Sequence, residues 1–375
     1  MTAKKTILKI FKNFGKIPVF LGLILTVFSV QCKSSKNLGQ LINSEVKKTM
    51  DTTDELRVFI ASNRQKNGNF PDCTNQYYTT EPSDQISFFS CDVNVPLMHS
   101  VGAIDVGANQ SNRDKYFSMG NHREMSENKF MSRINGGKSD PVMVFIHGFN
   151  VNFEESAYRA AQIAYDLKFQ GNIVLFSWPA GPENKFVEGV LKNITYQNDK
   201  NNAANSVDQA VQFFNRLGAL NGKIYIVVHS MGHQVVVPAL FKIGQESKKK
   251  FIKELVFNAP DFDITEMRAM LGLIQPLAER ITMYCSPGDN ALVASKTLNQ
   301  SHRAGLCAKI HGVDVINVNE VDTPVMGVGG LGHGYYSSRP LLVDLIQLFW
   351  GVEVEKRLFI RKGMNGNSED YVLRR

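Results

Sequence analysis

The sequence lacks several features that would each indicate a class of protein. Its 375 residues show no internal repeat, which excludes solenoids and propellers because these stack similar units along the chain. No Cys-x-x-Cys motif is present, so a common spacing of cysteine metal sites is missing. What is there is ordinary for a globular protein, with 43% hydrophobic and 21% charged residues.

The first 31 residues differ from the rest and resemble an export signal. Five lysines and no acidic residue precede an apolar run at 17–30, which is too short to span a bilayer comfortably and has the length of a signal-peptide core. A retained N-terminal anchor is the alternative. Residues 32–54 are polar and predict a linker. Cys32 directly follows the apolar run, as in lipid-anchored bacterial proteins, although Gln31 stands where a small residue is usual; cleavage nearby without lipidation remains the alternative.

The positive charge of the chain belongs mostly to this N-terminal segment. The whole chain carries 42 basic and 35 acidic residues, for a net charge of +7; without the five lysines of residues 1–31 the balance is 37 to 35, or +2. A nucleic-acid partner needs a basic stripe on the mature protein. The main basic cluster, residues 248–250, is more typical of a solvated helix end, so we expect no nucleic-acid partner.

The remaining four cysteines fall into two near pairs. Cys73 lies near Cys91 in the sequence, and Cys285 lies near Cys307. In an exported protein this arrangement favours two short-range disulfides. Four buried free thiols are the alternative, and the spacing alone does not decide between them.

The first part of the predicted domain, which spans residues 55–375, is rich in polar residues. Residues 56–61 predict a strand, residues 63–83 a loop, and residues 86–95 a strand that alternates as if one face were exposed. The polar composition of residues 107–140 predicts a surface excursion. Residues 63–140 are therefore expected to form either a lid or a side layer.

From residue 141 onward, short apolar runs alternate with helical patterns. The predicted strands lie at 142–146, 172–178, 223–228, 251–257, 280–285 and 313–318. The predicted helices lie at 152–167, 206–217, 231–243, 264–278 and 339–349. Continuous apolar strands separated by helices indicate an α/β fold with a mostly parallel sheet covered on both faces. Sites in such sheets lie at the carboxyl ends of the strands.

Two motifs follow such strands and suggest acyl-transfer chemistry. His229-Ser230-Met231-Gly232 opens a helix directly after a strand, which is the context of a nucleophile elbow, although Val228 replaces the first glycine of G-x-S-x-G. A serine that caps a helix is the alternative. His147-Gly148-Phe149-Asn150 follows the strand at 142–146, and the amides of Phe149 and Met231 are candidates for an oxyanion hole. A turn that needs Gly148 is the alternative.

The base and acid of such a site should come later in the chain. The histidines after the serine are His233, His302, His311 and His333. We favour His333, because it lies in a glycine-rich loop between the last predicted strand and the last helix; a surface-loop histidine is the alternative. Asp289 and Asp261 both follow predicted strands. Asp289 is favoured by its place after the penultimate strand, and Asp261 stays as the second candidate.

The order of these motifs resembles a bacterial α/β-hydrolase family of unknown function. The motifs are HGFN (147–150), FSWPA (176–180), HSMG (229–232), APDFD (259–263), SPGDNAL (286–292), residues 303–305, the GHG around His333 and the opening ASNR at 61–64. The resemblance covers about residues 56–350 and implies a triad of Ser230, Asp289 and His333. It also implies structural or pocket roles for Trp178, Pro179, Tyr196 and Asp199.

The predicted function is that of a serine hydrolase acting on ester-type bonds through an acyl-enzyme, with no metal and no cofactor. A metal enzyme built on the eight histidines is disfavoured, because another motif explains His229 and His233 better. The alternative function is an inactive envelope-associated binding or scaffold protein. The expected partner is a small-molecule or lipid ester, and the expected location is the cell envelope or outside the cell, with membrane association through the N-terminus.

Overall fold

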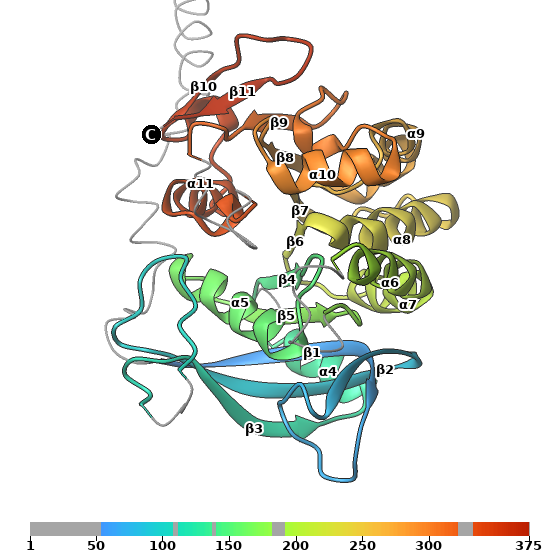
Figure 1. Ribbon diagram of the computed structural model, residues 1–375, viewed down its shortest axis with the longest axis vertical. Coiled ribbons are helices and arrows are strands. Elements are labelled where there is room, and N and C mark those ends of the chain that lie inside the picture. The colour runs from blue at the N-terminus through green and yellow to red at the C-terminus, as the bar shows by residue number, and fades with distance from the viewer. Residues whose placement is uncertain (1–53, 108–111, 137–139, 182–191, 322–332, 375) are drawn as a thin grey trace, which may run out of the picture. The chain divides into compact units, whose positions relative to one another are not determined.

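The computed structural model describes residues 54–107, 112–136, 140–181, 192–321 and 333–374 (Figure 1). These residues belong to one compact unit, which spans residues 46–375. The predictions of a signal or anchor at 1–31, a linker at 32–54 and lipidation at Cys32 lie outside the described residues. None of the helices in the described part has both the length and the apolar character that crossing a membrane requires.

The centre of the unit is an eleven-stranded sheet in the order β10-β11-β9-β8-β7-β6-β4-β5-β1-β2-β3. The strands are β1 (Asp54–Lys66), β2 (Tyr78–Val95), β3 (Ser118–Glu124), β4 (Val142–Ile146), β5 (Asn172–Ser177), β6 (Ile224–His229), β7 (Ile252–Asn258), β8 (Ala278–Cys285), β9 (Asp314–Asn317), β10 (Ile360–Lys362) and β11 (Tyr371–Leu373). Neighbours from β11 to β1 pair in parallel, whereas β2, β3 and β10 pair antiparallel. The predicted α/β fold with a mostly parallel sheet is confirmed.

Helices cover both faces of this sheet (Figure 1). They are α4 (Glu127–Ile134), α5 (Phe153–Asp166), α6 (Lys192–Asn205), α7 (Val207–Leu217), α8 (His233–Glu246), α9 (Ile264–Ile274), α10 (Asn290–Asn299) and α11 (Arg339–Phe349). Alternate residues of β4 divide between the two resulting cores. Val144 packs with α4, α7, α8 and α9 on one face, and Phe145 packs with α5 and α11 on the other. Two buried faces explain why the central strands have no polar alternation.

The order of the strands determines where a site can form. The chain passes from β4 to β5 on one side and then returns to place β6 on the other side of β4. Ile146 pairs with Val228 at the carboxyl ends of β4 and β6. This is a topological switch point, where the loops after two adjacent strands diverge to opposite faces and leave room for a ligand. The loops that follow β4 and β6 are those that carry the two predicted motifs.

Several predictions for residues 63–140 are wrong. β1 continues to Lys66 and β2 starts at Tyr78, so the loop predicted at 63–83 is shorter. Residues 88–95 of β2 are all buried, so no face of this part is exposed. Polar side chains can lie in these strands because they pair with one another across the sheet; Arg57 of β1, for example, donates to the buried Asp92 of β2 at 2.9 Å.

The predicted surface excursion at 107–140 also contributes to the core. β3 adds an eleventh strand to the sheet, and α4 buries Phe130 and Ile134. The Phe130 ring contacts Phe59 of β1 and Phe88 of β2, with centroids 5.9 and 5.1 Å away. The described residues of this segment therefore extend the sheet and cover one of its faces.

Cysteines close two loops in the structure. One disulfide joins Cys73, between β1 and β2, to Cys91 of β2. The other joins Cys285, at the end of β8, to Cys307. Both are the pairs that spacing favoured, and the second holds the chain beyond β8 next to the segment that precedes β9.

We predict that Phe130→Ala destabilises the protein by about 3–5 kcal/mol, because it removes a fully buried aromatic side chain and leaves a cavity. Phe70→Ala is the matched control, since 87% of the Phe70 side chain is exposed; we expect a change within about 0.5 kcal/mol. Urea unfolding of both variants measures the difference. Equal effects would show that α4 does not belong to the core.

Candidate active site

The turn after β6 holds Ser230 in an uncommon backbone conformation. Its φ of +52° lies in the left-handed region, which non-glycine residues rarely adopt and which is found often at functional sites. A short 3-10 turn, Ser230–Gly232, then leads into α8. A Cβ on Gly232 would lie 2.5 Å from the carbonyl oxygen of His147, so this position needs glycine. Val228 is accommodated because its side chain is buried in the core below the turn.

The side chains of Ser230, His333 and Asp289 meet above this turn. The Nε2 atom of His333 lies 2.7 Å from Ser230 Oγ, and its Nδ1 atom lies 2.6 Å from Asp289 Oδ2. All three residues are buried, with 4%, 6% and 0% of their surface exposed for the serine, the histidine and the aspartate. A hydroxyl, an imidazole and a carboxylate in series allow the hydroxyl proton to move to the imidazole, whose positive charge the carboxylate then stabilises.

The other candidate histidines occupy different positions. His229 stacks on Tyr336 with ring centroids 3.8 Å apart. His233 donates from Nδ1 to the backbone oxygen of Ser230 at 2.7 Å. Burial lowers the pKa of His233 to about 3 and that of His229 well below its usual value. Both are therefore neutral groups that pack beneath the serine. His302 and His311 each accept a hydrogen bond at the backbone oxygen, from Ile264 and Gln275.

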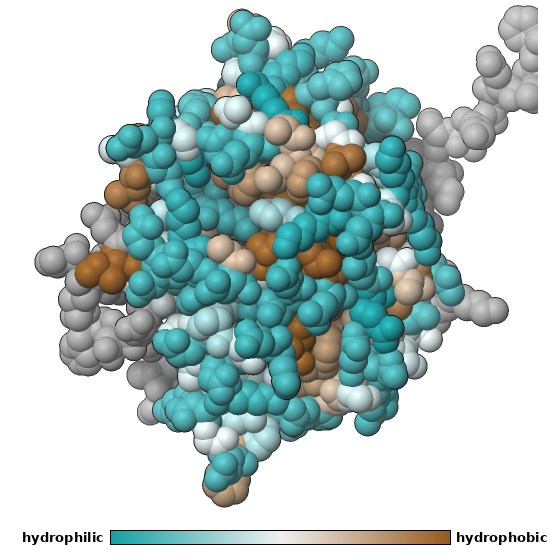
Figure 2. Space-filling model, turned by 90° about the vertical axis from the view of Figure 1, so that its right-hand side faces the viewer, coloured by the Kyte–Doolittle hydropathy of each residue, from teal (hydrophilic) through white to brown (hydrophobic). Residues whose placement is uncertain are grey.

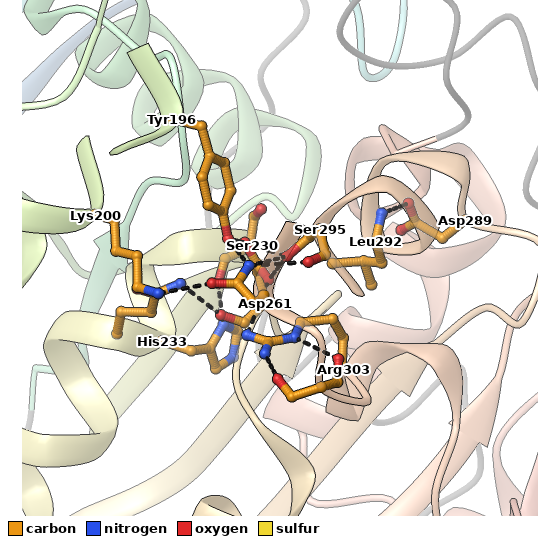
Figure 3. A network of polar contacts seen from close by, with 12 residues as sticks. Tyr196, Lys200, Ser230, His233, Asp261, Asp289, Leu292, Ser295 and Arg303 are labelled. Carbon is orange, nitrogen blue, oxygen red and sulfur yellow. Dashed lines mark hydrogen bonds and ion pairs between the residues drawn. The ribbon is translucent and has the colours of Figure 1, made fainter. Parts of the chain in front are cut away.

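Asp261 belongs to a separate polar network (Figure 3). Its carboxylate accepts hydrogen bonds from Tyr196 Oη at 2.9 Å and Ser295 Oγ at 2.5 Å, and it forms an ion pair with Arg303 at 3.7 Å. Its backbone N–H donates to the Ser230 carbonyl at 3.3 Å. The carboxylate that faces His333 is that of Asp289, so the geometry distinguishes the two candidate acids.

The loop after β4 packs directly against the serine turn. A Cβ on Gly148 would lie 2.7 Å from the Cβ of Ser230 and 2.9 Å from Nδ1 of His229. Trp178, which follows β5, donates to the carbonyl of His147 at 2.9 Å and stacks on its ring at 5.1 Å. Phe149 and Met231, the two oxyanion-hole candidates, thus belong to loops in contact.

Two charged residues that support this loop were not recognised from the residues alone. Arg64, from the end of β1, donates to the carbonyls of Val151 and Ala180. Asp199 of α6 accepts from the N–H groups of Asn150 and Gly181. The resemblance pointed to Asp199 and to the segment around Arg64. The only other signal was a pair of polar residues, Asn63 and Arg64, directly after an apolar strand.

A groove of about 410 Å³ lies beside the Asp261 network, on the side of α6, α8 and α9. Its lining includes Lys200, Gln234, Phe262, Met270 and Arg303. Figure 2 shows that face, which is mostly hydrophilic with small hydrophobic patches. The triad side chains are not part of this lining. Among the described residues, no group of three or more His, Cys, Asp or Glu side chains is arranged to hold a metal ion.

The parallel sheet, the strained serine turn and the adjacent His-Gly loop define the protein as an α/β-hydrolase. Residues 122–349 match the family described as alpha/beta hydrolase of unknown function (DUF900), and the chain belongs to this family. The resemblance seen in the sequence is thereby confirmed. No curated protein matches the chain.

Solved structures of esterases are distantly similar. One is a hyperthermophilic esterase from the archaeon Pyrobaculum calidifontis, with 11% identity, a TM-score of 0.30 and coverage of 88% of this chain and 96% of that chain. Another comes from a structural analysis of two fungal esterases from Rhizomucor miehei, with 12% identity, a TM-score of 0.34 and coverage of 89% and 95%.

We predict that Gly148→Ala lowers hydrolytic activity about 100-fold or more, since the methyl group would displace the serine turn by a substantial part of an ångström. Gly272→Ala is the control, because Gly272 is an exposed residue of α9 with open space around it. There alanine should stabilise the helix by up to about 1 kcal/mol and leave activity unchanged. Activity and melting temperature of both variants test this. Full activity in Gly148→Ala would contradict the contact.

The buried neutral histidines predict a loss of stability in acid. Between about pH 3 and 6.5, the His233 imidazole binds a proton in the unfolded chain but not in the folded protein. The contribution of His233 to the free energy of unfolding therefore decreases as the pH falls through this range. Asp199 and Glu254, whose pKa values burial raises to about 7, act in the opposite direction between about pH 4 and 7.

His233→Asn isolates the histidine contribution, because the carboxyl contributions are common to both proteins. The stability of the wild type relative to this variant should fall by about 1.4 kcal/mol per pH unit as the pH is lowered from 6 to 4. Denaturant unfolding at several pH values measures the slope. A difference that does not change with pH would refute the prediction.

Proposed function

We propose that the protein is a serine hydrolase that cleaves carboxylic ester-type bonds through an acyl-enzyme. The observation that carries the proposal is the pair of short contacts from His333 to Ser230 and to Asp289. Family membership supports hydrolysis in general. Neither the acyl nor the alcohol part of the substrate follows from these contacts, so amides, thioesters and lipid esters stay within the proposal.

In the first half of the reaction, Ser230 Oγ attacks the substrate carbonyl carbon while its proton passes to His333 Nε2. The carbonyl oxygen becomes an oxyanion, and the N–H groups of Phe149 and Met231 stabilise its charge. Asp289 holds the imidazole in position and stabilises the imidazolium. When the tetrahedral intermediate collapses, the bond to the leaving alcohol breaks and His333 returns the proton to that oxygen.

In the second half, a water molecule attacks the ester formed on Ser230. His333 accepts the proton of the water, and the second tetrahedral intermediate releases the carboxylic acid as the proton returns to Ser230 Oγ. Every proton in this cycle passes through one imidazole. The protein's own side chains and amides therefore supply all the groups that the cycle uses.

We also propose that the protein is exported and works in the cell envelope or outside the cell. The support is its two disulfides, Cys73–Cys91 and Cys285–Cys307, because disulfides persist in oxidising compartments. A basic N-terminal segment followed by an apolar run agrees with this location. Attachment to the membrane at Cys32 would bring the site to lipid esters.

A fluorophosphonate probe tests the nucleophile directly. We expect stoichiometric labelling of the wild-type protein on Ser230 and none in Ser230→Ala. Asp289→Asn should label at least about 1000-fold more slowly, because it leaves the imidazole in the wrong tautomer. Mass spectrometry of the labelled peptide gives the site, and circular dichroism shows that each variant is folded.

A folded wild-type protein that resists the probe would contradict the hydrolase and favour an inactive binding or scaffold protein. A panel of p-nitrophenyl esters of increasing acyl length, assayed on the wild type and Ser230→Ala, then gives the acyl preference. Turnover that persists in Ser230→Ala would exclude Ser230 as the nucleophile.

A further inference from the structure

Two buried charges of opposite sign, Arg64 and Asp199, hold the same two loops. Each residue is only 1% exposed. Arg64 donates to carbonyls in the loop after β4 (Val151, 3.0 Å) and in the loop after β5 (Ala180, 2.8 Å). Asp199 accepts from N–H groups in the same loops, at 2.7 Å from Asn150 and 3.1 Å from Gly181. Both charges thus act on the backbone that continues from the His-Gly motif.

The guanidinium is also fixed by β5 and β2. Its Nε donates to Ser177 Oγ at 2.9 Å, and Nη1 donates to the carbonyl of Thr79 at 3.2 Å. Arg64 therefore uses all three of its nitrogens, which only a planar fork of donors can do at one buried position. A buried charge is tolerated where hydrogen bonds compensate for its lost hydration. Here the compensating groups are the peptide groups of two loops.

The contact with Asn150 is the one closest to the chemistry. Asn150 follows Phe149 and has a φ of +59°, so the chain turns sharply just after the candidate oxyanion donor. The hydrogen bond from the Asn150 N–H to Asp199 fixes the peptide plane between Phe149 and Asn150. This restricts the rotation of Phe149 and hence the direction in which its own N–H points.

A second side chain of α6 supports the same residue. Tyr196 lies three positions before Asp199, on the same face of the helix, and its ring packs on Phe149 with centroids 5.5 Å apart. The Tyr196 hydroxyl donates to Asp261, whose backbone N–H donates to the carbonyl of Ser230. Helix α6 thus contacts Phe149 directly and the serine turn through Asp261. Figure 3 shows Tyr196 and Asp261 beside Ser230.

We propose that Asp199, together with Arg64, is a positioning residue that orients the Phe149 N–H for the oxyanion. The inference rests on the proposed hydrolase function. It assigns the two charges to transition-state stabilisation, because a fixed donor contributes most when the charge on the carbonyl oxygen develops. Substrate binding in the ground state depends on other contacts and should change little.

Burial has a strong effect on both groups, which agrees with this arrangement. It raises the pKa of Asp199 to about 7, even though the two amides and Arg64 act to lower it. It lowers the pKa of Arg64 to about 9. Both groups therefore lie in an environment of low polarity, where a hydrogen bond to the ionised form of either group is strong.

The test compares Asp199→Asn with Glu254→Gln. An asparagine keeps one acceptor oxygen but presents an NH₂ group to the other loop amide, so one loop is released. With p-nitrophenyl butyrate we expect kcat to fall about 10- to 100-fold while KM stays within about twofold. Inactivation by a fluorophosphonate should slow by the same factor and still reach full labelling of Ser230.

Glu254→Gln is the matched control, because Glu254 is an equally buried carboxylate whose pKa burial also raises to about 7. It lies near the start of β7, at the end of the sheet opposite the site, and pairs with Arg280 at 3.1 Å. We expect it to lower the melting temperature and leave kcat unchanged. A general loss of stability would affect both variants, whereas a positioning role affects only Asp199→Asn.

If Asp199→Asn does not fold, Arg64→Lys is measured instead. A lysine ammonium cannot reach Ser177 and the carbonyls of both loops at the same time, so this variant also releases part of the loop backbone. The same fall in kcat at constant KM is expected. Unchanged kcat in the folded variant, or an equal fall in Glu254→Gln, overturns the inference. A wild-type protein that the probe does not label overturns the proposed function instead, so the two failures are distinguishable.

Discussion

The contact between the His-Gly loop and the serine turn is the constraint on which the site depends. Gly148 leaves no room for a side chain against Ser230, and Gly232 leaves none against His147. The two loops can approach this closely only because β4 and β6 are adjacent parallel strands that end at the same level, with Ile146 opposite Val228. The strand order, the two glycines and the left-handed conformation of Ser230 are therefore all needed for the two loops to make this contact.

The layers around this contact have different tasks. His229 and His233 fill the space below the serine as neutral rings. The Asp261 network connects the serine turn to α6 and α10, which is why an aspartate after a strand can be structurally important without facing the imidazole.

The central sheet was predictable from the sequence, because short uninterrupted apolar runs between helical patterns are typical of parallel strands that are buried on both faces. The predicted strand at 142–146 coincides with β4, and the predicted helix at 339–349 with α11. Ser230 and His333 could be found because a motif or a loop position marks them. The place after the penultimate strand favoured Asp289 over Asp261, but both follow strands, and only their three-dimensional reach shows which carboxylate faces His333.

The N-terminal layer was the least predictable part. Residues 88–95 of β2 are buried although several of them are polar, because Asp92 pairs with Arg57 and Arg123, which lie far away in the chain. Arg64 illustrates the general difficulty. A lone arginine after a strand looks like a surface residue, and its four hydrogen-bond partners come from three other segments of the chain.

Asp289 divides its two oxygens between different partners. Oδ2 contacts the imidazole of His333, whereas Oδ1 accepts from the N–H of Leu292 and so caps the first turn of α10. The carboxylate cannot rotate without breaking its hydrogen bond to the Leu292 N–H. The start of α10 therefore fixes the orientation of the imidazole through Asp289. A glutamate would carry the same charge on a longer arm and could not reach both partners at once, so shape as well as charge selects aspartate here.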